Sequence, residues 1–501
     1  MLRQWHLIGC AVITVIFLTF SLSASDDISA SDAELEFQLG SLLLQESRYE
    51  EALVAFKRAS QSPDAALVSL ARQGKIRVEL ALAEFGAAQI DAAALLRDEP
   101  SSITAQTLYA DSLWASGLFD EAEAVYVSAL ERDPESSRAR YGWARSLATK
   151  NRLHEALNEA LVASAASPLD PDIYHDIGQI YERLNRFPEA ANAYESYVNF
   201  LPYKEENDRA LWSLAQVDFL RAFDGKTPMQ IESRPELRHT VSFRLRNGKI
   251  IIPVRLNGRP REMVLDTGAE KNVISEVTAS RLGIRPITYT LSAGVGEVGL
   301  RGLQLGRLDS FQIGSLKVNH VPVLIKSPGL TGIPSREPDS FSPLALGLSV
   351  TIDYQNHSLT MGYELEEEAS DFSLPMRVHR LAMVRGLLNE SHPAYFVVDT
   401  GGEVISISQS TAGILNMRPP RHIPLKVYGV SGWDREAFLL PGVDLQFQDI
   451  HYQNFPVVVL NLRVPSILLG FDLGGIVGHK FLASYRVTMD LVKSELRLKS
   501  Y

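Results

Sequence analysis

The sequence is poor in the residues that several chemistries need. Its one cysteine, Cys10, lies in an N-terminal apolar segment, which excludes a catalytic thiol in the folded body. The eleven histidines are scattered and no H-E-x-x-H occurs, so we expect no metal and no other cofactor. A formal net charge of -11 disfavours nucleic acid and an anionic membrane surface as partners.

The N-terminal segment predicts export. Arg3 precedes an apolar run from Leu7 to Phe20, and Ser21-Leu22-Ser23-Ala24-Ser25 follows before the first acidic residues. This order is typical of a secretory signal cleaved near Ala24. The run is short for a membrane span, but its extension to Ala24 leaves an uncleaved anchor open. We therefore expect residues 1–24 to be a signal peptide or an inner-membrane anchor at residues 7–24, and the body to be periplasmic in a bacterium with two membranes.

Alanines recur at a fixed period in the next part of the chain. Ala52, Ala122, Ala156 and Ala190 are spaced 70, 34 and 34 residues apart, and 70 is two units of 34 with a two-residue insertion. With the glycines and prolines at matching positions, this region resembles tetratricopeptide (TPR) repeats. The resemblance implies an all-α solenoid over residues 32–223, with a degenerate second repeat near Ala88 and a capping helix at 205–223.

Such a solenoid has a concave groove suited to an extended peptide or a partner's helix. We expect it to recruit a protein substrate or to dock the chain in an envelope assembly. A rigid spacer or dimerisation arm is the alternative. Residues 224–240, with Lys226, Pro228 and Pro235, read as a linker to the second half of the chain.

The triplet Asp-Thr-Gly occurs twice in that second half, as Asp266-Thr267-Gly268 and Asp399-Thr400-Gly401. The first triplet ends a predicted hairpin of residues 250–255 and 262–265 with a turn at Asn257-Gly258, and the second follows the apolar run 393–398. Continuous apolar residues are typical of strands buried on both faces, so each aspartate is expected at the rim of a packed sheet. Gly268 and Gly401 let the backbone turn tightly beside the carboxylates.

The duplication continues downstream of each triplet. Residues 349–354 and 358–361 match residues 486–491 and 495–498, at an offset of 137 against 133 for the triplets. Each unit also carries an apolar pair before a glycine, Ala345-Leu346-Gly347 in one and Ile476-Val477-Gly478 in the other. Two homologous units of similar length therefore stand in tandem, joined by an acidic connection at 364–371.

On these residues, the region 241–501 resembles the aspartic protease superfamily, in particular retropepsin-like bacterial aspartyl proteases. The resemblance implies two all-β lobes, 241–363 and 374–501, in one polypeptide as in pepsin-like enzymes. It implies a peptide or protein substrate and, for the active site, catalytic Asp266 and Asp399 on loops supported by Thr267, Gly268, Thr400 and Gly401. The expected fold is thus an all-α solenoid followed by an all-β bilobal protease.

Two carboxylates held about 3 Å apart cannot both ionise, so one keeps a proton while the other acts as a base. A water between them can then attack a peptide carbonyl, which predicts an aspartic endopeptidase. Their titrations belong to the pair, so the sequence does not assign the proton to either aspartate. The resemblance also implies that the hydroxyls of Thr267 and Thr400 hydrogen-bond across the lobe interface.

Two departures from the family pattern leave an alternative open. Gly402 stands where related enzymes carry alanine, serine or threonine, as at Ala269, so Asp399 is expected to be less firmly oriented. From Gly347 to Asp353 is six residues, against twelve from Gly478 to Asp490, which predicts that the first lobe has lost a short helix. The alternative is a catalytically inactive peptide-binding or scaffold protein of the cell envelope.

Gly294-Val295-Gly296-Glu297-Val298-Gly299 fits the dinucleotide pattern G-x-G-x-x-G. That pattern needs a helix after its last glycine, whereas Leu300 to Ile313 alternates like a strand. We therefore interpret Gly294, Gly296 and Gly299 as a flap that closes over the substrate, with Tyr289 as the nearest flap tyrosine. Residues 429–433 take the equivalent place in the second unit.

Overall fold

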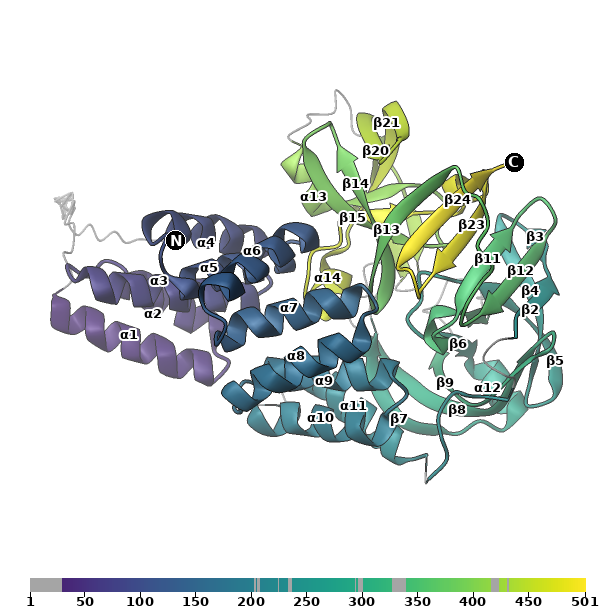
Figure 1. Cartoon of the computed structure of the whole chain (residues 1–501), viewed down its shortest axis with the longest axis horizontal. Helices are drawn as coiled ribbons and strands as arrows, with labels where there is room; N and C mark the ends of the chain where they lie inside the picture. The colour runs from purple at the N-terminus through teal and green to yellow at the C-terminus, as the bar shows by residue number, and fades with distance from the viewer. Residues whose placement is uncertain are drawn as a thin grey trace, which may run out of the picture.

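The computed structural model describes residues 29–201, 204, 208–223, 225–232, 237–292, 294–295, 301–326, 339–415, 423–429 and 432–501. The predicted signal or anchor, residues 1–24, lies outside this set. Within the described residues, no helix has the length and apolarity needed to cross a membrane. Figure 1 shows helices in the N-terminal half of the chain and strands in the C-terminal half, with the two halves in contact.

The N-terminal half is a solenoid of helix pairs, as predicted. Its helices are α1 (Ala30–Gln45), α2 (Tyr49–Ala59), α3 (Ala65–Ala81), α4 (Phe85–Asp98), α5 (Ile103–Ala115), α6 (Phe119–Arg132), α7 (Ser137–Thr149), α8 (Leu153–Ala166), α9 (Pro171–Arg183), α10 (Phe187–Phe200) and the capping helix α11 (Asp208–Arg221). The first helix of every pair begins after a residue whose side chain accepts a backbone N–H, at Ser29, Asp64, Ser102, Ser136 and Asp170. These caps satisfy helix-end donors and set the repeat boundaries.

Small residues let the paired helices approach closely. The predicted repeat alanines Ala52, Ala122, Ala156 and Ala190 are completely buried, and so is Ala88 of the degenerate second repeat. Gly142 on α7 lies against the ring of Tyr126 on α6, so that a Cβ there would sit 2.1 Å from a ring carbon. The 34-residue period therefore encodes inter-helix packing.

The C-terminal half contains strands and short helices. In the first lobe these are β1 (Gln230–Ile231), β2 (His239–Ser242), β3 (Arg244–Arg246), β4 (Lys249–Leu256), β5 (Arg259–Leu265), β6 (Asn272–Ser275), α12 (Glu276–Leu282), β7 (Pro286–Ser292), β8 (Arg301–Ile313), β9 (Leu316–Lys326), β10 (Ser340–Phe341), the 3₁₀ helix Leu344–Leu346, β11 (Ser349–Asp353) and β12 (Ser358–Gly362). The turn between β4 and β5 has positive φ at Asn257 and Gly258, 47° and 76°, as a two-residue hairpin turn requires.

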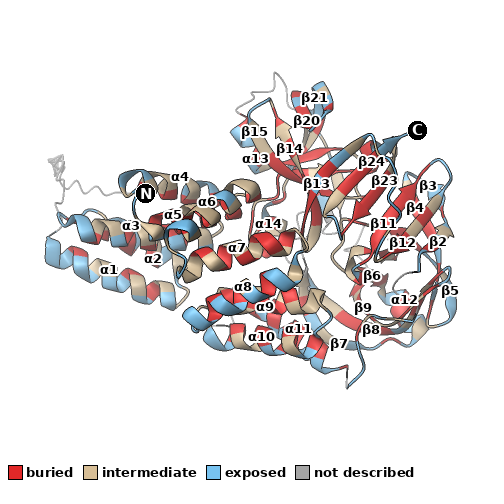
Figure 2. Cartoon of the chain, in the orientation of Figure 1, coloured by how far each residue is buried: buried red, intermediate tan, exposed pale blue. Residues whose placement is uncertain are grey.

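The second lobe repeats this order. It contains β13 (Phe372–His379), β14 (Leu381–Leu388), β15 (His392–Val398), β16 (Ser406–Ser408), α13 (Gln409–Ile414), β17 (Ile423–Pro424), β18 (Val427–Gly429), β19 (Gly432–Asp434), β20 (Phe438–Phe447), β21 (Ile450–Leu460), α14 (Arg463–Leu469), β22 (Gly475–Val477), α15 (His479–Leu482), β23 (Tyr485–Asp490) and β24 (Glu495–Ser500). One buried apolar core runs through both lobes, seen as the red strands of Figure 2.

A shared sheet joins the lobes in the order β2-β12-β11-β23-β24-β13. Each lobe supplies three strands, and the order of the second three mirrors that of the first. At the centre, Thr351 pairs with Thr488, its own equivalent at the offset of 137, and their hydroxyl oxygens are 2.9 Å apart. The two tandem units are therefore related by a local two-fold axis through this pair.

The solenoid packs directly on the second lobe. Trp114 and Phe119 of the repeats share a buried cluster with Tyr395 and Phe471 of the lobe, and the Phe119 ring lies 4.9 Å from that of Tyr395. On the other side, α11 packs along β7 of the first lobe. The first helices of the third to fifth repeats, which would line a free groove, are thus covered in part by this chain's own C-terminal half (Figure 1).

Candidate active site

Two equivalent strands deliver the two aspartates. β5 ends at Leu265 and runs parallel to β10, whereas β15 ends at Val398 and runs parallel to β22. The N–H of Asp266 donates to the Phe341 carbonyl at 2.9 Å, and the N–H of Asp399 donates to the Val477 carbonyl at 3.0 Å. Both aspartates therefore follow a strand at the rim of a sheet, with the same backbone support.

This register corrects the predicted equivalence of Ala345-Leu346-Gly347 and Ile476-Val477-Gly478. The parallel pairing places Phe341 opposite Leu265 just as Val477 lies opposite Val398, so Ser342 is the counterpart of Gly478. The first lobe has not lost a helix: a 3₁₀ turn at Leu344–Leu346 occupies the place of α15. The sequence comparison was wrong here because β10 is short and flanked by the polar residues Asp339 and Ser342. The apolar residues that resemble the end of β22 instead form the 3₁₀ helix Leu344–Leu346.

The loops that carry the aspartates are locked together by their threonines. The N–H of Thr267 donates to the Thr400 hydroxyl at 3.1 Å, and the N–H of Thr400 donates to the Thr267 hydroxyl at 3.0 Å. Each hydroxyl in turn donates across the interface, Thr267 to the Val398 carbonyl at 2.7 Å and Thr400 to the Leu265 carbonyl at 2.8 Å. Both threonines are completely buried, so these four bonds fix the lobes at the level of the aspartates.

The glycines of the triplets place each loop against the opposite carboxylate. A Cβ on Gly268 would lie 2.4 Å from Cγ of Asp399, and a Cβ on Gly401 would lie 2.6 Å from Oδ1 of Asp266. The N–H of Gly401 donates to Oδ1 of Asp399 at 2.6 Å, which orients that carboxylate. The structure therefore brings Asp266 and Asp399 together, half-buried, in hydrogen-bond contact.

Electrostatics favour a proton on this pair. Burial and then the neighbouring Asp399 charge raise the pKa of Asp266 to about 8. The ammonium of Lys249, which donates to the Gly401 carbonyl, opposes this shift. Sequence reasoning missed Lys249 because its contact spans 152 residues and no local pattern marks it.

The predicted flap is the connection between two long paired strands. Ser292 of β7 pairs with Arg301 of β8, so β7 and β8 are the two strands of a hairpin, and β8 continues as the strand expected from the sequence. Gly294 is described, whereas Gly296 and Gly299 lie outside the described residues. Tyr289 points away from the lobe with 67% of its surface exposed.

A second hairpin, β18–β19, meets this one from the other lobe. Gly429 lies against Val295, where a Cβ would be 2.3 Å from the Val295 carbonyl oxygen. The rings of Tyr428 and Trp433 stack edge to face on it, with centroids 5.2 Å apart. Both lobes thus contribute a hairpin, and the two hairpins meet at Val295 and Gly429.

The repeats brace the strand that leads to Asp399. Asp120 on α6 accepts from the Tyr395 hydroxyl on β15 at 2.8 Å and from Arg385 on β14 at 2.9 Å. It also accepts from Arg377, whose side chain is 5% exposed. No local sequence pattern predicts these contacts, because they join residues more than 250 positions apart.

Residues just after Asp266 make the corresponding contacts in the first lobe. Glu270 accepts from Arg380 of the second lobe at 2.6 Å, and the Arg380 guanidinium lies 5.0 Å from the ring centre of Trp212 on α11. Lys271 faces Glu182 on α9 at 3.6 Å. The repeats and both lobes therefore meet beside the active-site loop.

No group of three or more His, Cys, Asp or Glu side chains with metal-binding geometry occurs among the described residues. The arrangement instead defines a bilobal β protein in which each lobe contributes one carboxylate to a single pair at the lobe interface. An aspartyl protease family model matches residues 252–350 and 384–473, and each range contains one Asp-Thr-Gly triplet. Tetratricopeptide repeat models match residues 107–171 and 171–199. The chain thus carries TPR repeats followed by a duplicated aspartyl-protease-like region.

Among curated proteins, no significant match was found. Solved structures similar to this chain cover its helical half. A thermophilic TPR protein from Thermus thermophilus, TTC0263, is 18% identical over 37% of this chain and 98% of its own, with a TM-score of 0.32. The TPR protein YrrB, described as having an unusual peptide-binding site, is 18% identical over 36% of this chain and 90% of its own, with a TM-score of 0.23. PilF of Pseudomonas aeruginosa is 16% identical over 39% and 85%, with a TM-score of 0.28.

Proposed function

We propose that this chain is an aspartic endopeptidase that hydrolyses peptide bonds with a water activated between Asp266 and Asp399. The observation that carries the proposal is the pair of hydrogen-bonded, half-buried carboxylates on loops held by the reciprocal threonine bonds. Such a preorganised pair performs general acid and base catalysis without moving its supports.

In the proposed reaction, the ionised carboxylate takes a proton from the water, which attacks the peptide carbonyl. The protonated carboxyl donates its proton to the carbonyl oxygen, so the tetrahedral intermediate forms without free charge. The carboxyl that took the water's proton then gives it to the nitrogen, the other carboxylate takes a proton from a hydroxyl of the intermediate, and the C–N bond breaks to release the amine and the carboxylic acid. The raised pKa of Asp266, about 8, supports a proton on the pair up to neutral pH. The contact between Val295 and Gly429 would have to open for a peptide to enter.

The alternative of an inactive scaffold protein rested on two sequence features, a helix missing from the first lobe and Gly402. The first no longer supports it, because the first lobe keeps the backbone support under Asp266. Gly402 is also weaker evidence for an inactive protein than the sequence suggested. A Cβ at that position would lie 2.9 Å from Oδ2 of Asp399, so the glycine leaves the space that this carboxylate uses. These observations favour the enzyme.

We propose that the repeats act chiefly as a brace for the protease lobes. Recruitment through the groove of the third to fifth repeats would compete with the contacts that Trp114, Glu182 and Arg183 make with the lobes. A protein partner would instead meet α1, where Leu35, Leu39 and Leu42 are exposed along one face. Export to the periplasm, with cleavage or anchoring at residues 1–24, completes the proposal and rests on the sequence.

Asp266→Asn and Asp399→Asn, made separately, test the activity. Each variant is incubated with a diverse peptide mixture from about pH 4 to 8, and cut sites are read by mass spectrometry. We expect cleavage by the parent and none by either variant, at unchanged melting temperature. Cleavage that persists in both variants would remove the dyad from the mechanism.

A further inference from the structure

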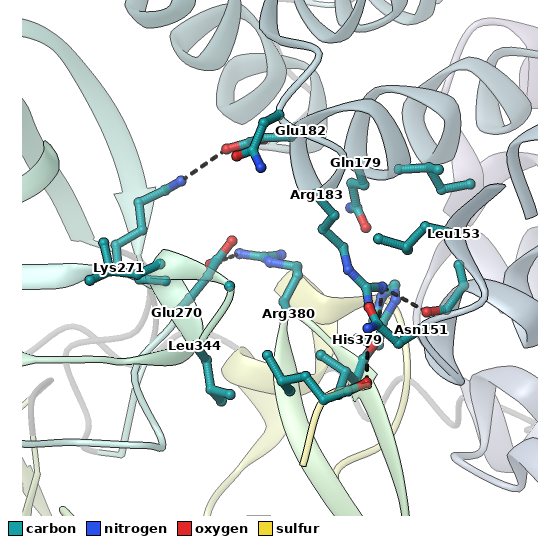
Figure 3. A pocket seen from close by; sticks show the side chains of 18 of the residues that line it. Asn151, Leu153, Gln179, Glu182, Arg183, Glu270, Lys271, Leu344, His379 and Arg380 are labelled. Atoms are coloured by element: carbon teal, nitrogen blue, oxygen red, sulfur yellow. Dashed lines mark hydrogen bonds and ion pairs between the residues drawn. The ribbon is translucent and has the colours of Figure 1, made fainter. Parts of the chain in front are cut away.

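A cavity of about 310 Å³ lies where the repeats meet both lobes, and its size is that of a small-ligand site. Its walls come from α7, α9 and α11, from the loop after Asp266, and from the β13–β14 turn. Figure 3 shows Arg183, Arg380, Glu270, Lys271 and Glu182 arranged around it. This cavity is separate from the aspartate pair, because neither Asp266 nor Asp399 lines it.

The charges of the lining do not balance. Four cations face three carboxylates: the cations are Arg145, Arg183, Lys271 and Arg380, and the carboxylates are Asp176, Glu182 and Glu270. His379, also in the wall, is neutral because burial lowers its pKa to about 3. The cavity therefore carries one positive charge in excess.

Each carboxylate is already engaged by another cation. Glu270 lies 2.6 Å from Arg380, Asp176 lies 3.3 Å from Arg145, and Glu182 lies 3.6 Å from Lys271. The excess cation is thus Arg183, the one arginine of the lining that has no carboxylate partner among the described residues.

Arg183 is held only by neutral oxygens. It donates to the Ala148 carbonyl at 2.7 Å, to the Val378 carbonyl at 3.2 Å and to Oδ1 of Asn151 at 2.8 Å. Loss of water around it lowers its pKa to about 10. A guanidinium away from water without an anion is costly, and an oxyanion beside it would relieve that cost.

The neighbouring guanidinium, that of Arg380, is already engaged. Its Nη atoms bind the Leu468 carbonyl and Glu270, although Nε of the same side chain is buried and makes no hydrogen bond to the described residues. Arg183 makes three hydrogen bonds to the described residues, whereas a guanidinium can donate five, so it keeps donors for an anion in the cavity.

We propose that this cavity binds a small oxyanion, a carboxylate or phosphate group, on Arg183. The ligand would sit where α9 meets the β13–β14 turn, next to the Glu270–Arg380 ion pair behind Asp266. Binding would tighten the docking of the repeats on the lobes, because only the docked arrangement builds the site. The proposal concerns binding and does not depend on peptide cleavage.

The test is thermal unfolding of the full chain in sodium phosphate and in sodium acetate, each compared with sodium chloride at equal ionic strength. We expect phosphate, acetate or both to raise Tm by about 3 °C at saturation. The salt that acts identifies the ligand as phosphate or carboxylate. Equal Tm in all three salts would overturn the proposal.

Two variants locate the effect. Arg183→Gln should abolish the response, whereas the control Arg186→Gln, whose native partner is the exposed Glu189, should keep it. If Arg183→Gln does not fold, Gln179→Glu tests the anion site at Arg183 instead. Gln179 lines the cavity four residues before Arg183 on α9, so a glutamate there supplies the missing anion from the protein. It should raise basal Tm and remove the response; an undiminished response in Gln179→Glu would refute the site.

Discussion

The Tyr395 hydroxyl donates to the Asp120 carboxylate across 2.8 Å and so ties the strand that leads to Asp399 to the third helical repeat. Burial alone would raise the pKa of Asp120, but the charge of Arg377 and the hydrogen bonds from Arg377, Tyr395 and Arg385 outweigh it and lower the pKa. The folded carboxyl is therefore more acidic than the unfolded one. Its contribution to stability is present above the unfolded pKa and is lost as pH falls through the folded pKa.

We predict that Asp120→Asn lowers the free energy of unfolding by about 2 kcal/mol at neutral pH, because it weakens charge-assisted bonds to a buried guanidinium. The loss relative to the parent should shrink as Asp120 of the parent becomes protonated in acid. Urea unfolding at neutral and acidic pH measures both. Glu155→Gln, which removes an exposed pair with Arg152, is the control and should match the parent.

Thr400→Val should damage both stability and rate. The variant keeps the shape of the side chain but leaves the N–H of Thr267 without its acceptor and the Leu265 carbonyl without its donor. We expect a loss of about 2 kcal/mol in unfolding free energy and a lower kcat. Thr400→Ser retains the hydroxyl and should recover most of both, so equal defects in the two variants would contradict the role of the hydrogen bonds.

Lys249→Met should move the alkaline limb of the pH profile upward. The ammonium favours the ionised form of Asp266, so its removal raises the pKa of that carboxyl above the value of about 8. Since the dyad needs its proton, activity should persist to higher pH than in the parent. The measurement is kcat/KM across pH. Lys480→Met is the matched control, because Lys480 pairs with Glu403 at the surface and should leave the limb in place.

Gly402→Ala separates catalytic geometry from stability. The added Cβ would meet Oδ2 of Asp399 at 2.9 Å and the side chain of Ile476 at 3.3 Å, so the carboxylate must shift. We expect kcat to fall about ten-fold, with little change in Tm. Gly413→Ala, on α13 with nothing within 4 Å of the new Cβ, should leave kcat unchanged. An unaltered kcat in Gly402→Ala would show that Asp399 tolerates the displacement.

The parts of the fold that repeat were accessible from the sequence. A 34-residue alanine period predicted the solenoid, and the doubled triplet with its flanking apolar runs predicted two β lobes, because in both cases packing imposes a periodic pattern. The equivalence of Phe341 and Val477 was not accessible, since hydrogen bonds of the parallel strands define it and the side chains differ. Contacts such as Asp120 with Tyr395 left no pattern, because each is a single pairing between distant positions.

The covering of the repeats by the second lobe also has a consequence for biosynthesis. The helical half leaves the ribosome first, and its local contacts allow it to fold before either lobe is complete. Trp114 and Phe119 would then form an apolar surface on the folded repeats, against which β15 can pack as it is synthesised. A C-terminal half expressed without the repeats would expose Tyr395 and Phe471 to solvent and would aggregate, so the order of the two halves along the chain favours correct assembly.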